Sequence, residues 1–148
     1  MRVLITLLFS ICCFPAAAAD DAFVVRNAWV REAPPGAEVL AAYFEIENRT
    51  AAGRQLIAAS SKDAERIEIH TVTLHDGVAR MSPIPALALP PGRVVALKPG
   101  GYHLMLHKPR RALTEGTTVA IELRFDSGAP LTVQAPVRRA QGPMMHHR

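Results

Sequence analysis

The chain has 148 residues, a formal net charge of +4 and 49% hydrophobic residues, of which few are aromatic. This length fits one globular domain with a substantial hydrophobic core. Because the positive residues are dispersed and aromatic side chains are scarce, the composition argues against a nucleic-acid-binding protein.

The N-terminal segment has the parts of a secretory signal peptide. Arg2 gives the positive start, residues 3–14 are apolar, and four alanines precede Asp20. The apolar stretch is shorter than the roughly 20 residues that a spanning helix needs. We predict a signal peptide over residues 1–19 and a periplasmic mature protein without a membrane span. A lipid anchor is the alternative, but neither Cys12 nor Cys13 follows the usual Leu-small-small pattern.

Removal of the signal peptide also removes both cysteines, so the mature chain has no disulfide and no thiolate ligand. The rest of the chain consists of short β-rich segments separated by Gly and Pro turns, which predicts an all-β sandwich or barrel. One domain is expected over residues 20–140, followed by a flexible tail that contains Met and His over residues 141–148. The expected strands cover residues 23–31, 40–47, 54–59, 66–74, 94–97, 102–107, 118–125 and 131–137.

The methionines of the mature chain occur near histidines. A methionine that only fills the core would be found throughout the apolar strands, whereas the strands around Phe44, Ile57 and Ile121 contain none. In the segment 102–107, side chains alternate between faces, so His103 and Met105 share one face while Leu104 and Leu106 share the other.

A second His–Met pair is predicted from a hairpin. Asp76-Gly77 is a typical two-residue turn, and a turn there opposes residues whose numbers sum to 153, so Val72 faces Met81. His70 is then the diagonal neighbour of Met81 on the same face, about 7–8 Å away. A register slip of one residue would separate the two side chains.

The donor types in these two pairs favour Cu(I). Thioether sulfur is soft and uncharged, and together with imidazole it suits Cu(I). Zinc normally recruits thiolate, imidazole or carboxylate, and a blue-copper centre needs a cysteine thiolate. We find no nucleophile–base set and no open catalytic metal triad, so we do not expect an enzyme.

The motif His-x10-Met-x21-His-x-Met, met by His70, Met81, His103 and Met105, resembles that of the PCu(A)C family of periplasmic copper chaperones, also called DUF461. The resemblance also includes the segments 25–31, 41–44, 68–70 and 99–106. It implies a cupredoxin-like, Greek-key β-sandwich that binds Cu(I) at an exposed site formed by these four residues.

The resemblance further implies delivery of copper to the CuA centre of cytochrome c oxidase subunit II, alongside a Sco-type thiol protein. Some members carry a Met/His-rich extension that binds a second copper, including Cu(II). The tail residues Met144, Met145, His146 and His147 are either a short form of that extension or an ordinary chain end.

Two alternatives to delivery stay open at this point. The same site would serve copper sequestration or tolerance without a dedicated acceptor, and the fold alone would also suit a non-metal interaction module. We expect a monomer. His75 is expected to be solvated beside the turn. His107 could lie on the ligand face, two residues past Met105, but we expect it to be a peripheral surface residue.

Overall fold

The computed structural model describes residues 22–139. The predicted signal peptide, and the tail with its two methionines and two histidines, lie outside these residues. Within the described range every regular element is a strand, and no helix there is long and apolar enough to cross a membrane. The strands are β1 (Phe23–Arg31), β2 (Val39–Asn48), β3 (Arg54–Ser60), β4 (Ala64–His75), β5 (Val78–Pro83), β6 (Leu87–Leu89), β7 (Val94–Leu97), β8 (His103–Pro109), β9 (Thr118–Phe125) and β10 (Leu131–Arg138).

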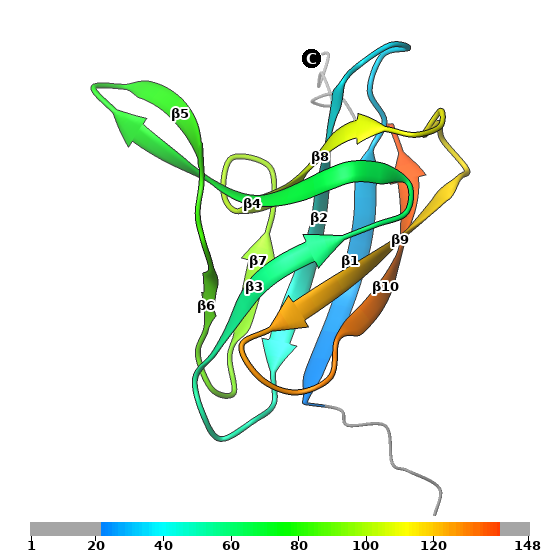
Figure 1. Ribbon diagram of the computed structural model, residues 1–148. Coiled ribbons are helices and arrows are strands. Elements are labelled where there is room, and N and C mark those ends of the chain that lie inside the picture. Colours follow the sequence, from blue (N-terminus) through cyan, green and yellow to red (C-terminus); the bar gives the residue numbers. More distant parts are fainter. Residues whose placement is uncertain (1–21, 140–148) are drawn as a thin grey trace, which may run out of the picture.

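Seven of these strands form a closed sandwich, in the order β4-β8-β2-β1-β10-β9-β3, with β3 pairing back onto β4. The closing contact opposes Ala59 and Ile67. In Figure 1, β3, β4 and β9 cross in front of β1, β2 and β10. All pairings are antiparallel except that between β1 and β10, so the all-β expectation is confirmed.

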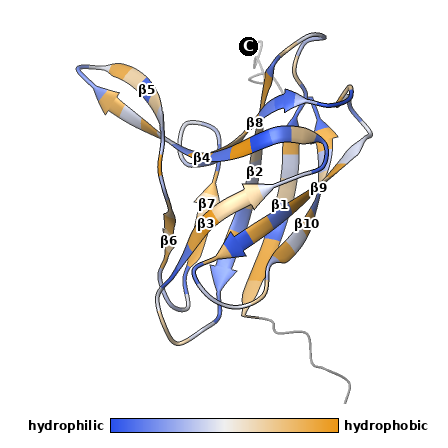
Figure 2. Cartoon of the chain, viewed as in Figure 1, coloured by the Kyte–Doolittle hydropathy of each residue, from blue (hydrophilic) through white to orange (hydrophobic). Residues whose placement is uncertain are grey.

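The core fills the space between these two layers. Figure 2 shows hydrophobic and hydrophilic residues alternating along several strands, as expected where one face of a strand is buried. Leu104 and Leu106 are fully buried and Ile69 is 4% exposed, so the predicted inward face of β8 and part of that of β4 are confirmed. The largest fully buried apolar side chains come from seven strands: Val30, Ile46, Leu56, Leu89, Leu104, Leu106, Val119, Ile121, Leu123 and Val137.

The β4–β5 hairpin extends beyond the sandwich (Figure 1). Its turn residues Asp76 and Gly77 have φ angles of 50° and 77°, the left-handed values that a two-residue turn requires and that glycine adopts at little cost. The register opposes Val72 to Met81, so the predicted hairpin is confirmed. Because its outer half pairs with no third strand among residues 22–139, Met81 is placed at a sheet edge.

Candidate metal centre

Three neighbouring strands, in the order β5-β4-β8, carry the candidate residues on one face. The register opposes His70 of β4 to His103 of β8, and directly opposed residues point to the same side of a sheet. Their ring centroids are 5.6 Å apart. The two histidines, 33 positions apart in the sequence, are therefore neighbours in space.

The two methionines lie at the same place. Met81, His103 and Met105 line one cleft of about 410 Å³, together with Val72 and Tyr43 among others. Met105 lies opposite Ala41 on β2, which also lines the cleft. His70 adjoins the cleft through its contact with His103. Three of the four residues predicted from the sequence thus line the cleft, and the fourth, His70, lies beside one of them.

Burial differs sharply among these residues. His70 and His103 are 7% and 4% exposed, whereas Met81 is 63% exposed. The ring of Tyr43 lies 6.4 Å from that of His103, measured between centroids, and helps to cover it. The centre therefore has two fixed imidazoles at its base and one thioether in contact with solvent.

The hydrogen bonds of the two histidines determine which ring nitrogens are free. His103 Nδ1 lies 3.1 Å from the carbonyl oxygen of Gly101, and since a carbonyl only accepts, Nδ1 carries the proton and Nε2 keeps its lone pair. His70 Nε2 lies 3.1 Å from Glu68 Oε2, so by the same reasoning Nε2 carries the proton. His70 Nδ1 is buried and has no hydrogen-bond partner among the described residues.

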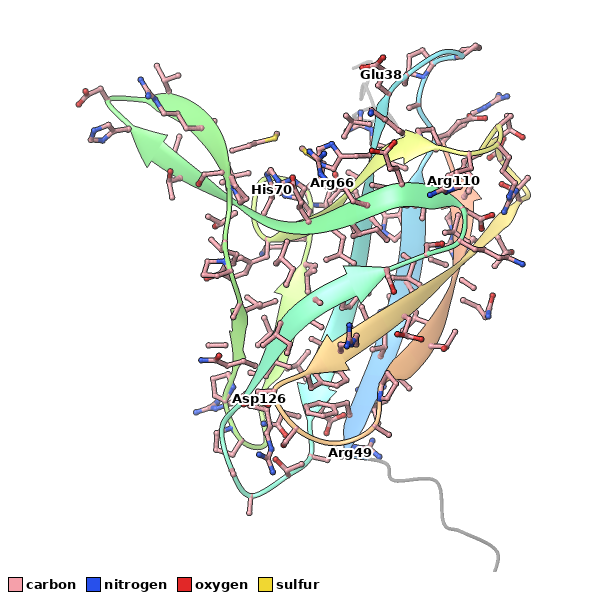
Figure 3. All side chains as sticks on the ribbon, in the orientation of Figure 1. Glu38, Arg49, Arg66, His70, Arg110 and Asp126 are labelled. Atoms are coloured by element: carbon pink, nitrogen blue, oxygen red, sulfur yellow. The ribbon has the colours of Figure 1, made fainter. Side chains whose placement is uncertain are left out.

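Glu68 is a feature of the site that the motif does not include. The pKa of its carboxyl group is lowered, chiefly because the carboxylate accepts the hydrogen bond from His70, with the charge of Arg66 acting in the same direction. Arg66 Nε donates to Glu68 Oε1 at 3.2 Å, which leaves Oε2 facing the histidines. Figure 3 shows Arg66 and His70 on β4. Glu68 is therefore an ionised acceptor that orients His70.

His107 also lies at this site, and its predicted position as a peripheral surface residue is wrong. Its side chain is 16% exposed, and Nε2 lies 2.8 Å from Glu68 Oε2. His75 is exposed beside the hairpin turn, as expected. The alternation that puts His103, Met105 and His107 on one face of the strand could be seen in the sequence. The contact between His107 and Glu68 could not, because it depends on the β4–β8 register.

Comparison with known proteins places the chain in a family. The LpqE-like family model matches residues 23–137. "Putative lipoprotein Lxx21020" of Leifsonia xyli is 28% identical over 123 residues, which are 82% of this chain and 73% of that protein. The protein RP573 of Rickettsia prowazekii is 33% identical over 98 residues, and the match spans 66% of this chain and 54% of that protein.

The fold is also similar to those of solved structures, including two in copper-bound forms. The solution structure of Cu(I)-bound DR1885 from Deinococcus radiodurans has a TM-score of 0.66 and 32% identity, covering 83% of this chain and 82% of that one. The copper-bound PCuAC domain of PmoF2 has a TM-score of 0.69 and 22% identity, covering 80% and 94%. The shared architecture confirms the expected cupredoxin-like sandwich. The chain therefore belongs to the PCu(A)C, or DUF461, family, which it matches through the LpqE-like model.

Proposed function

We propose that this protein is an exported copper chaperone that binds Cu(I) through His70, Met81, His103 and Met105. The observation that carries the proposal is that Met81, His103 and Met105 line one cleft while His70 lies opposite His103 on the neighbouring strand. The copper-bound state of DR1885, at 32% identity, supports copper as the cargo.

The free nitrogens support this ligand set. His103 Nε2 and His70 Nδ1 are the atoms that the hydrogen bonds to Gly101 and Glu68 leave with lone pairs. An unpartnered buried nitrogen costs free energy, and a bound metal ion would relieve that cost at His70. Two imidazoles and two thioethers form a soft, uncharged set that prefers Cu(I) to harder divalent ions.

The uneven burial of the ligands supports a role in transfer. Met81 is 63% exposed and lies on the edge hairpin, so an acceptor can replace it without opening the sandwich. His70 and His103 are buried, so they hold the ion until the acceptor supplies further donors. The expected sequence of events is loss of Met81, approach of an acceptor ligand, and then release from the remaining three residues.

For the acceptor, we propose the CuA centre of cytochrome c oxidase subunit II, with a Sco-type thiol protein as an accompanying partner. We propose that the predicted signal peptide exports the protein to the periplasm, and the lipoprotein name of the Leifsonia relative agrees with an exported family. The alternative is sequestration. A deletion strain separates the two: loss of oxidase activity at low copper supports delivery, and copper sensitivity with normal oxidase supports sequestration.

The binding proposal is tested by titrating the mature chain with Cu(I) against a colorimetric chelator. We expect one tight equivalent in the wild type and its loss in the His103→Ala, Met105→Leu double variant. His75→Ala is the matched control, because His75 is exposed and outside the cleft. Absence of binding by the wild type, or unchanged binding in the double variant, would reject the proposed site.

A further inference from the structure

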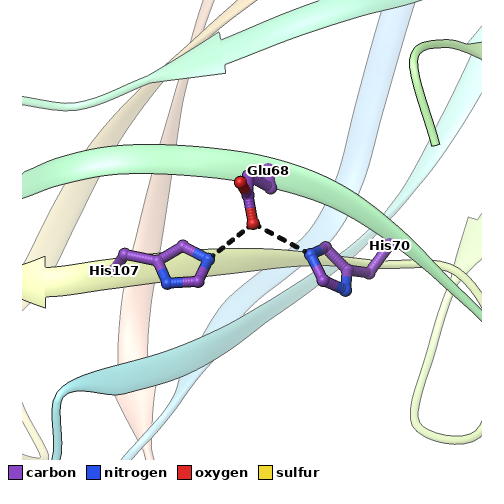
Figure 4. A group of neighbouring side chains, drawn as sticks. All are labelled: Glu68, His70 and His107. Atoms are coloured by element: carbon purple, nitrogen blue, oxygen red, sulfur yellow. Dashed lines mark hydrogen bonds and ion pairs between the residues drawn. The ribbon is translucent and has the colours of Figure 1, made fainter. Parts of the chain in front are cut away.

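Beside the proposed Cu(I) ligands lies a second group of metal-binding side chains: Glu68, His70 and His107. One donor atom from each lies within 4.8 Å of the other two. Figure 4 shows the Glu68 carboxylate between the two imidazole rings, with His107 on one side and His70 on the other. His70 is the only member of this group that also belongs to the His/Met set.

The strand register produces this second group. Glu68 and His70 are two residues apart on β4 and therefore share a face. On β8, His107 opposes Arg66, and Met105 opposes Glu68, so His107 is the diagonal neighbour of Glu68. The side chains of His70 and His107 are 9% and 16% exposed, and that of Glu68 is 34% exposed. The group is thus partly shielded, with an opening to solvent at the carboxylate.

The distances in the group suit a coordinated ion. Glu68 Oε2 lies 3.1 Å from His70 Nε2 and 2.8 Å from His107 Nε2. With metal–ligand bonds of about 2.0–2.1 Å, neighbouring donors in a tetrahedral site are about 3.3 Å apart. His107 Nε2 is buried, and it contacts Glu68 Oε2 at ion-pair distance but outside hydrogen-bond geometry. A metal ion between these two atoms would bind both.

The donor types differ from those of the Cu(I) site. Two imidazoles and one carboxylate, with a fourth position left for water, form a set that suits Zn(II) or Cu(II) and contains no thioether. Because Arg66 holds the other carboxylate oxygen, Oε2 is the oxygen directed at the ion. We propose that Glu68, His70 and His107 form a binding site for a divalent transition-metal ion, separate in its ligands from the Cu(I) site except for His70.

Sharing His70 makes the two sites mutually exclusive, a consequence that rests on the proposed Cu(I) site. A neutral imidazole has one proton and one lone pair. With Cu(I) on Nδ1, Nε2 carries the proton and donates to Glu68; with a divalent ion on Nε2, the proton moves to Nδ1 and that nitrogen cannot bind Cu(I). The chain would then hold either Cu(I) or a divalent ion, and occupancy would follow the tautomer of His70.

The test uses Zn(II), which has no redox chemistry and little affinity for thioether. The mature chain carries His146→Ala and His147→Ala, so that the tail does not contribute, and a chromophoric chelator competes for the ion. We expect one Zn(II) equivalent, weakened at least tenfold by His107→Gln and by Glu68→Gln. Met105→Leu and His75→Ala are controls that should bind Zn(II) as the parent does, and circular dichroism verifies the fold of each variant.

The same variants are then titrated with Cu(I). We expect His107→Gln to retain Cu(I) binding and Met105→Leu to lose it, the reverse of the Zn(II) result. Unchanged Zn(II) affinity in both His107→Gln and Glu68→Gln would overturn the divalent site. Simultaneous binding of both metals with undiminished affinities would overturn the shared use of His70. If the parent binds Zn(II) but not Cu(I), the divalent site stands and the proposed Cu(I) function fails.

Discussion

Replacing Glu68 tests whether this carboxylate orients His70 for Cu(I). Glu68→Ala removes the acceptor of the 3.1 Å hydrogen bond from His70 Nε2, so the ring loses its preferred tautomer and orientation. Loss of such an outer partner typically weakens metal binding about 10–100-fold, or about 1.4–2.8 kcal/mol. Because the Glu68 side chain is 34% exposed, water can replace part of the hydrogen bond, and we expect a loss near tenfold.

The matched variant is Glu68→Gln, whose amide oxygen still accepts from Nε2. We expect its Cu(I) affinity to lie within about threefold of the wild type, since the carbonyl keeps the acceptor while the charge is lost. The assay is Cu(I) competition against a chelator of known affinity. Wild-type affinity in Glu68→Ala would refute the orienting role, and an equal loss in both variants would show that the charge of Glu68, rather than its hydrogen bond, is what matters.

Three predictions concern the scaffold. Leu104→Ala should lower the free energy of unfolding by about 2–5 kcal/mol in urea titrations, because Leu104 is fully buried; a loss below 1 kcal/mol would contradict its place in the core. Gly77→Ala should lower the free energy of unfolding by about 1–2 kcal/mol, because alanine is strained at a φ of 77° even though its added Cβ would meet nothing within 4 Å; an unchanged stability would show that this turn does not require glycine. The pKa of Asp63 is lowered chiefly by its hydrogen bond from Arg111. This depressed pKa contributes stability above the unfolded pKa near 4 that is lost as the pH falls through the folded value. Asp63→Asn should therefore show a flatter decline of stability below pH 4, and an unchanged decline would remove this pair as a source of acid sensitivity.

The local parts of the fold could be predicted from the sequence. Alternation and turn residues locate most strands to within a residue or two, and the Asp76-Gly77 turn alone sets the register that opposes Val72 to Met81. The short strand β6 was not predicted, because three residues are too few to show the alternation that marks a half-buried strand. β5 is exposed along its whole length, and it was expected only as the partner strand of the Asp76-Gly77 hairpin.

The non-local parts could not be predicted in the same way. The β4–β8 register joins residues more than 30 positions apart and depends on how the whole sandwich closes. That register brings His70 opposite His103 and His107 diagonal to Glu68. The family motif anticipated the first of these contacts through its spacing, whereas the second involves residues outside the motif and became visible only in three dimensions.

The most direct test of the Cu(I) site is X-ray absorption spectroscopy of the copper-loaded mature chain under reducing conditions. The proposed ligands predict a Cu(I) centre with two nitrogen and two sulfur scatterers, and the loss of one sulfur scatterer in Met81→Leu. A copper shell that contains only nitrogen and oxygen, or a sulfur count that does not change in Met81→Leu and Met105→Leu, would contradict the account.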